Sequence, residues 1–156
     1  MPEYQHTGVL SRQDLLQMPS EAQLEKGVAF IECVQEIPCN PCVDACPVHA
    51  ISMKDINAQP HVDFDKCTSC QRCVGVCPGL AIFVLKVKDT KGYVTLPYEL
   101  LPVPKVGTVV DALDREGKRR GPAKVTKVLK VKKTLLVTIE VDRGLIMDVR
   151  NIRVSA

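Results

Sequence analysis

A four-cysteine pattern that occurs twice constrains this chain more than any other feature. The second copy is regular, with two, two and three residues between its cysteines and a proline after the last: Cys67, Cys70, Cys73 and Cys77. The first copy matches it at an offset of 31 residues in three cysteines, the last again followed by proline: Cys39, Cys42 and Cys46. Thiols in such close groups indicate a segment that folds around whatever the thiols bind.

The regular copy has the spacing of a bacterial 4Fe-4S site. Three cysteines two residues apart can curl a loop around one side of an iron–sulfur cube, with backbone N–H groups turned towards the cluster sulfurs. The alternative metal is structural zinc, but zinc sites use pairs of cysteines separated by a longer loop, which this pattern fits poorly. Because the N-terminus lacks the pattern of an export signal, disulfides fit less well still. The two copies therefore predict two 4Fe-4S clusters.

The first cysteine of the first copy is displaced. The regular spacing would put a cysteine at position 36, but that residue is Glu36 and the cysteine is Cys33. The segment from Phe30 to Cys33 matches that from Phe64 to Cys67 at an offset of 34, three more than the later cysteines. We interpret Cys33 as the ligand on a longer loop, because iron–sulfur clusters prefer thiolate. Glu36 as an oxygen ligand, or a 3Fe-4S cluster with a vacant corner, remain the alternatives.

Residues 27–85 resemble a bacterial dicluster ferredoxin in these two copies, each ending in a cysteine followed by proline. The resemblance implies a ferredoxin-like fold with a pseudo-twofold repeat. It also implies crossed ligation, in which the last cysteine of each copy serves the other cluster. One cluster would be held by Cys33, Cys39, Cys42 and Cys77. The other would be held by Cys67, Cys70, Cys73 and Cys46.

The charge of the chain divides it into unlike parts. Residues 1–85 hold five Lys or Arg against ten Asp or Glu, whereas residues 86–156 hold sixteen against eight. All eight cysteines lie in the acidic part. We therefore predict an α+β protein with an N-terminal arm of short helical turns (1–26), a dicluster ferredoxin domain (27–88) and a basic β-rich module (89–156).

Local patterns predict the elements of these parts. In the arm, Ser20 is placed to cap a helix from Glu21 to Lys26 that ends at Gly27. β-prone runs flank both cysteine copies, at 28–31, 50–53, 61–64 and 81–87. Five further runs predict a small all-β barrel or sandwich: 93–96, 108–113, 123–131, 137–141 and 149–154. The proline-rich segment 96–107 is predicted to be a connection, because proline is disfavoured in central strands.

Other classes of function find little support. No segment reaches the roughly 18 uninterrupted apolar residues of a membrane span. No glycine-rich phosphate loop of the GxGxxG or GxxxxGK type occurs. The basic segment 118–133 could attract nucleic acid, but no aromatic residue follows Tyr98, and single-strand binders stack bases on aromatic rings. Nucleic acid is therefore not an expected partner.

The whole layout resembles the small iron–sulfur subunits of multi-subunit flavin-dependent amino-acid dehydrogenases of the proline and hydroxyproline type. The motif IECVQEIPCNPCVDACPVHAI and the ending MDVRNIRV carry this resemblance. It implies a cytoplasmic, non-catalytic subunit of a hetero-oligomer that relays single electrons between a flavin on a partner chain and a second acceptor. A free-standing soluble ferredoxin and a nucleic-acid-binding protein with structural clusters are the alternatives.

Overall fold

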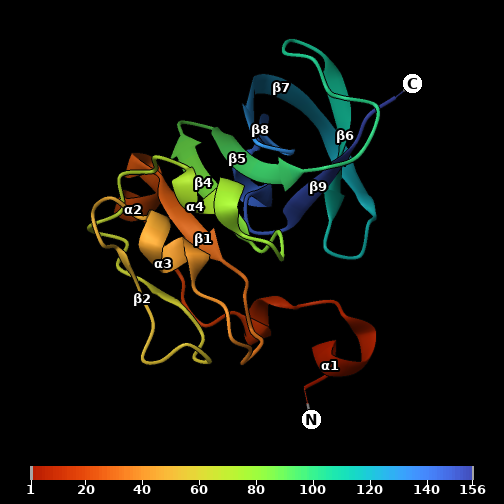
Figure 1. The fold of residues 1–156 in the computed structure, drawn as a ribbon. Coiled ribbons are helices and arrows are strands. Elements are labelled where there is room, and N and C mark those ends of the chain that lie inside the picture. The colour runs from red at the N-terminus through yellow and green to blue at the C-terminus, as the bar shows by residue number, and fades with distance from the viewer. Residues whose placement is uncertain (1, 156) are drawn as a thin grey trace.

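The computed structural model of the protein describes residues 2–155. Within this range the chain forms a seven-stranded sheet, a two-stranded sheet and four short α-helices (Figure 1). The helices are α1 (Tyr4–Thr7), α2 (Glu21–Lys26), α3 (Pro41–Ala45) and α4 (Arg72–Val76). Single turns of 3-10 helix cover Arg12–Asp14 and Arg143–Leu145. The strands are β1 (Val28–Ile31), β2 (Ile51–Ser52), β3 (His61–Val62), β4 (Ile82–Lys88), β5 (Lys91–Tyr98), β6 (Val109–Asp114), β7 (Arg119–Val131), β8 (Thr134–Asp142) and β9 (Val149–Arg153).

The N-terminal arm packs on the chain's own surface. α2 begins where the Ser20 hydroxyl accepts a hydrogen bond from the Gln23 N–H (3.3 Å), which confirms the predicted cap. It ends at Gly27, where φ is +94° and a side chain would be strained. Further along the arm, Arg12 Nη2 lies 2.9 Å from the Asp148 carboxylate, close to β9. The arm therefore finds its contacts within this chain.

The two cysteine copies are joined to each other by strand pairing. β1, which precedes the first copy, pairs antiparallel with β4, which follows the second. β2, which follows the first copy, pairs with β3, which precedes the second. α3 and α4 are in contact, and each ends just before a cysteine that is followed by proline, Cys46 or Cys77. Each of these two strand pairs therefore joins a strand beside the first cysteine copy to a strand beside the second.

The predicted boundary between residues 88 and 89 lies inside the larger sheet. Its strand order is β1-β4-β5-β8-β7-β6-β9, all neighbours antiparallel. β4 and β5 form a hairpin at this position, and Lys88 pairs with Lys91. Leu85 of β4, Val94 of β5 and Ile139 of β8 are all fully buried in one core. The cysteine-bearing and basic segments thus share a sheet and a core.

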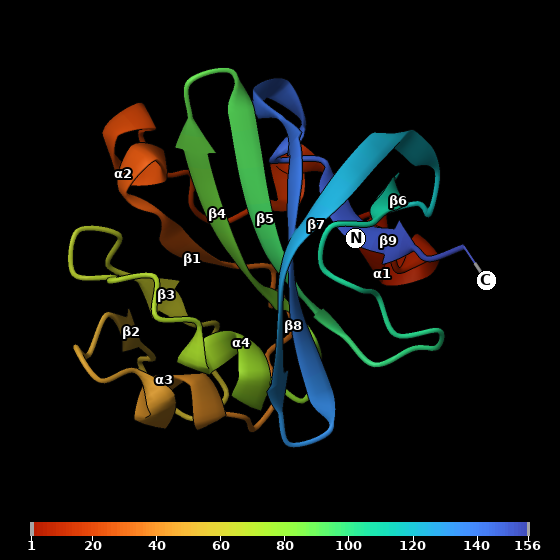
Figure 2. The same cartoon turned by 90° about the horizontal axis from the view of Figure 1, so that it is seen from above.

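Strands β5 to β9 curl away from β1 and β4 (Figure 2). β9 pairs with β6 and also lies against β5. Within the residues described, no β-ladder joins β9 to β5, so hydrogen bonds do not close the curl. A register shift in β7 between Val125 and Lys127 contributes to the bend, because a bulge increases local twist.

The predicted connection over 96–107 is partly wrong, because β5 continues to Tyr98 and includes Pro97. β5 lies between β4 and β8, where proline is disfavoured. Its pairing with β4, however, ends at Thr95, while its pairing with β8 continues past Leu136. Pro97 therefore lies where β5 has a strand neighbour on one side alone, and its missing N–H costs no hydrogen bond to β4.

Candidate metal centres

A first cavity, cavity 1, lies between the enlarged cysteine loop and the start of β4. Four cysteines line it: Cys33, Cys39, Cys42 and Cys77. Its walls are mostly apolar and include Ile31, Ile37 and Ile82. Glu36 is exposed to solvent and is not among the lining residues. The longer loop therefore turns the Cys33 thiol towards the other three while Glu36 faces away from them.

A second cavity, cavity 2, lies beneath the regular cysteine loop. The remaining four cysteines line it: Cys46, Cys67, Cys70 and Cys73. Cys67 and Cys73 are buried, whereas Cys70 is exposed, so one side of this cavity is near solvent. Ala29 of β1 and Ile51 of β2 contribute apolar wall. The structure thus brings the eight thiols together as two groups of four, each with one cysteine from the other copy.

Two matched turns direct backbone N–H groups at sulfur. The Ala50 N–H lies 3.2 Å from Cys46 Sγ, and the Ala81 N–H lies 3.4 Å from Cys77 Sγ. The alanines are 31 residues apart, as are the cysteines. In both turns the residue before the alanine has φ of +53°, which aims the following N–H back at the thiol. The two copies therefore place the last cysteine in the same local conformation.

The first cysteine of each copy is also met by a backbone N–H two residues later. Ser69 donates to Cys67 Sγ at 3.4 Å, and the N–H of Ala29 in β1 donates to the same sulfur at 3.2 Å. In the first copy, the Gln35 N–H interacts with the Cys33 thiol and partly offsets the rise in the Cys33 pKa that burial causes. Cys33 and Cys67 thus share the N–H two residues later despite the longer loop, and Cys67 receives a second N–H from β1. N–H groups aimed at sulfur stabilise the thiolate and the reduced state of a cluster.

Burial makes the free thiols reluctant to ionise. Burial raises the pKa of Cys42 to about 11, helped by the neighbouring Cys77. It raises the pKa of Cys73 to about 12, helped by Cys67, and it also raises that of Cys33. A metal ion reverses this, because a coordinating thiol is deprotonated outright. Iron binding at these groups therefore releases protons and is favoured at higher pH.

The donor set fits a four-iron cluster. Each cavity offers four thiols, one for each iron corner, together with apolar walls and N–H groups directed at sulfur. Within residues 2–155, no three His, Cys, Asp or Glu side chains come close enough together to hold a single metal ion.

A buried ion network next to Cys33 escaped the sequence analysis. Glu32 Oε1 accepts hydrogen bonds from Arg115 Nε (3.1 Å) and Arg150 Nε (2.8 Å). The side chains of Glu32, Arg115 and Arg150 are only 7%, 11% and 5% exposed. The partners are 83 and 118 residues from Glu32 in sequence, so no local pattern links them. The network ties the cysteine-bearing segment to the β6–β7 turn and β9.

Arg150 is the central cation of this network. Its Nη1 donates to the carbonyl oxygens of Ile146 and Val149, at 2.6 Å each. Its guanidinium carbon lies 5.5 Å from the ring centre of Phe30 and 5.1 Å from that of Phe83. Burial lowers the pKa of Arg150, and the charge of Glu32 opposes the shift. Nη2 has no hydrogen-bond partner, and the two aromatic faces supply attraction in its place.

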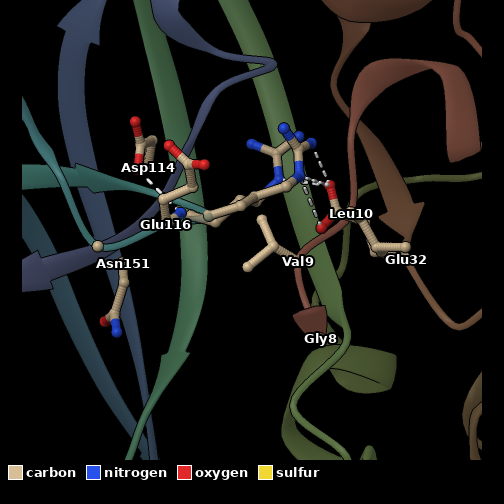
Figure 3. Close-up of a pocket in the computed structure, with 10 residues that line it drawn as sticks. Gly8, Val9, Leu10, Glu32, Asp114, Glu116 and Asn151 are labelled. Atoms are coloured by element: carbon tan, nitrogen blue, oxygen red, sulfur yellow. Dashed lines mark hydrogen bonds and ion pairs between the residues drawn. The ribbon is translucent and has the colours of Figure 1, made fainter. Parts of the chain in front are cut away.

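An open cavity lies beside the network, away from the cysteines (Figure 3). The arm contributes Gly8, Val9 and Leu10 to one side, and the β6–β7 turn contributes Asp114 and Glu116 to the other. Its lining includes both acidic and basic side chains, so it offers no strong concentration of one charge.

The cysteine-bearing segment is similar to known iron–sulfur proteins. Residues 32–81 match the 4Fe-4S dicluster domain. The matched segment contains all eight cysteines. A dicluster domain with eight cysteines carries two 4Fe-4S clusters. No solved structure matches the chain.

Three curated relatives share this part of the chain. The polyferredoxin-like subunit of an aliphatic sulfonate oxidoreductase from Pyrococcus furiosus is 45% identical over 47 residues, 30% of this chain and 27% of the relative. The ferredoxin-type protein NapF from Haemophilus influenzae is 35% identical over 78 residues, which are 48% of this chain and 44% of the relative. A subunit of an ion-translocating oxidoreductase complex from Methanosarcina acetivorans is 39% identical over 57 residues, which are 36% of this chain and 20% of the relative. The chain thus spans less than half of each relative. Within residues 2–155, no helix has the length and apolar character needed to cross a membrane.

Proposed function

We propose that this protein relays single electrons through its two clusters as a subunit of an oxidoreductase complex. The observation that carries the proposal is the pair of neighbouring four-thiol cavities, because contacting helices α3 and α4 contribute cysteines to both. The charge of the Cys42 thiolate in cavity 1 even contributes to the raised pKa of Cys73 in cavity 2. When bound, each cluster can take up and release one electron. The polypeptide holds the two clusters near each other and tunes them.

The proposed ligand sets are crossed between the copies. Cluster 1 takes Cys33, Cys39, Cys42 and Cys77. Cluster 2 takes Cys67, Cys70, Cys73 and Cys46. The positions of Cys77 in cavity 1 and Cys46 in cavity 2 support this assignment. The exposed position of Glu36 favours Cys33 as the remaining ligand of cluster 1.

We also infer a pseudo-twofold repeat within the predicted domain 27–88. The matched turns before Ala50 and Ala81 support it, as does the pairing of β1 with β4 and of β2 with β3. In the predicted module 89–156, the curl of β5 to β9 supports an incomplete barrel. In the predicted arm 1–26, two side chains support a role as an anchor: Gln17 donates to the Val62 carbonyl of β3, and Arg12 donates to Asp148, next to β9.

The proposed redox partner is a flavin-containing dehydrogenase subunit, in a cytoplasmic hetero-oligomer. The resemblance in the cysteine motif and the ending supports this partner, and flavins take part in one-electron chemistry. Two of the relatives are, by name, subunits of oxidoreductases. A free-standing ferredoxin is the second candidate, favoured by the name of the third relative, a ferredoxin-type protein.

Anaerobic purification from the native host tests the proposal. We expect about eight irons and eight sulfides per chain, as two cubanes require. Electron paramagnetic resonance (EPR) of the reduced protein should show two interacting spins, and flavoprotein chains should co-purify. A colourless chain loaded with zinc would end the relay proposal. A chain with eight irons that elutes alone would favour the free-standing ferredoxin.

A further inference from the structure

The connection between β5 and β6 exposes an unusual amount of apolar surface. We call residues 99–109 the apolar loop. Five of its large apolar side chains are 49% to 85% exposed: Leu100, Leu101, Val103, Val106 and Val109. Single exposed apolar residues are ordinary, but several in one short segment mark an interaction site.

The apolar loop is held firmly in place. Pro104, in the middle of the loop, is buried. The Tyr98 hydroxyl donates to the Pro102 carbonyl at 3.2 Å, at the start of the loop. The Gly107 N–H donates to the Val125 carbonyl of β7 at 2.8 Å, near its end. A segment anchored at both ends loses little conformational entropy on binding, which suits it to present its side chains to a partner.

Lysines border the apolar loop. Lys105 lies within it, and Lys124 is directly opposite Val109 in the β6–β7 ladder, with both side chains exposed. The β7–β8 turn approaches from the other side, because Thr134 donates a hydrogen bond to Glu99 at 2.6 Å. That turn carries Lys132 and Lys133, and Lys130 precedes it in β7. Glu99 is the one acidic residue of the loop sequence, and the lysines around the loop outnumber it, so the border carries a net positive charge.

The β7–β8 hairpin end separates the apolar loop from α4: Thr134 contacts Glu99 on one side, and Val131 lies against Gly75 on the other. Both views place the β5–β6 connection on one side of the molecule and α3 and α4 on the other, with β5, β8 and β7 between them (Figures 1 and 2). A partner bound to the side of the loop that faces away from α4 would leave the surface of both cavities free for electron exchange.

We propose that the apolar loop docks this chain onto a partner subunit through an apolar groove bordered by Asp and Glu. The exposed side chains supply the apolar centre of the contact. The lysines around the loop favour a partner with Asp and Glu at the facing positions. The inference deepens the proposed function and rests on its subunit role. It assigns the basic half of the chain to assembly and leaves the acidic half to electron transfer.

Paired substitutions in the native complex test the surface. Leu101→Ser with Val106→Ser should release the chain from the anaerobically purified complex, seen by native mass spectrometry. The released chain should keep eight irons and an unchanged EPR spectrum. Lys105→Glu with Lys124→Glu should weaken the complex and reverse its salt dependence. Met18→Ser, which alters a comparably exposed residue of the arm, and Lys88→Glu serve as controls that stay in the complex.

A photo-crosslinking residue at position 101 identifies the occupant. Crosslinks to Asp- or Glu-rich peptides of one other subunit support the proposal. Crosslinks to a second copy of this chain, or a complex that retains the double serine variant, overturn the docking surface while the subunit role stands. A wild-type chain that never forms a hetero-oligomer overturns both, so the two failures are distinguishable.

Discussion

The two cavities hold the same number of thiols, but the chain surrounds them differently. Cavity 1 is bounded by an enlarged loop in which Pro38 and Pro41 have no N–H to donate. Its Cys77 sulfur receives an N–H at 3.4 Å, whereas Cys46 and Cys67 of cavity 2 each receive one at 3.2 Å. N–H groups near sulfur make a cluster easier to reduce. Two sites with four thiols each can therefore differ in reduction potential. We expect cluster 2 to be the more easily reduced of the two.

The helices beside the cavities differ in how closely they pack against the large sheet. α4 packs against the end of β7, and a Cβ atom added to Gly75 would lie 2.9 Å from Val131 Cγ1. The equivalent position of α3, 31 residues earlier, is Asp44, which is exposed. Cavity 2 is thus supported by the sheet, whereas cavity 1 is supported through its loop and the ion network beside it.

Removing the displaced cysteine should break the comparison most severely. Cys33→Ala should cost cluster 1 its first corner, giving a 3Fe-4S signal or complete loss of that cluster, while cluster 2 persists. Iron quantitation and EPR check this. Glu36→Ala is the matched control and should leave both cubanes intact. Two intact cubanes in Cys33→Ala would contradict the ligand assignment.

Uncoupling the buried network should destabilise the cavity 1 side. Glu32→Gln leaves two buried guanidinium groups without their anion, and removing one partner of a buried pair costs about 3–5 kcal/mol. The melting temperature of the anaerobic protein should fall by about 2–4 °C per kcal/mol. Arg119→Gln removes the more exposed ion pair with Asp111 and should cost about 0–1 kcal/mol. Equal losses in both variants would refute a special role for the buried network.

Alanine placed at each of the two equivalent helix positions should separate the two supports. Gly75→Ala overpacks α4 against β7 and should cost about 1–3 kcal/mol. Asp44→Ala on exposed α3 should change stability by about 0.5 kcal/mol or less. Melting temperatures of the two variants give the comparison. A Gly75→Ala protein as stable as Asp44→Ala would mean that α4 can move away from Val131 freely.

The smallest expected effect concerns the reduction potentials. In the wild-type protein, cluster 2 should be reduced at the higher potential in an EPR-monitored titration. Pro38→Ala with Pro41→Ala restores two N–H groups to the enlarged loop and should narrow the gap between the clusters. Cys70→Ser assigns the signals, because it alters cluster 2 alone. A titration in which cluster 1 is reduced first would reverse the comparison.

Much of the cysteine-bearing region was predictable because its information is local. Cysteine spacing predicted two clusters, and serine and glycine caps predicted the bounds of α2. The Glu32–Arg115–Arg150 network was not predictable, because its members meet only after β6, β7 and β9 pair. The place of Pro97 in β5 depended likewise on where the neighbouring strand β4 ends. Pairing over long separations decides such features, and a single sequence carries no local sign of it.

The β4–β5 hairpin has an evolutionary consequence. β4 pairs with β1 on one edge and with β5 on the other. A gene shortened after residue 88 would therefore expose that second edge, and valine and leucine side chains that are buried in the full chain, to solvent. We expect such a fragment to aggregate through this edge before it binds iron. The cysteine-bearing half and the lysine-rich half must therefore be encoded together.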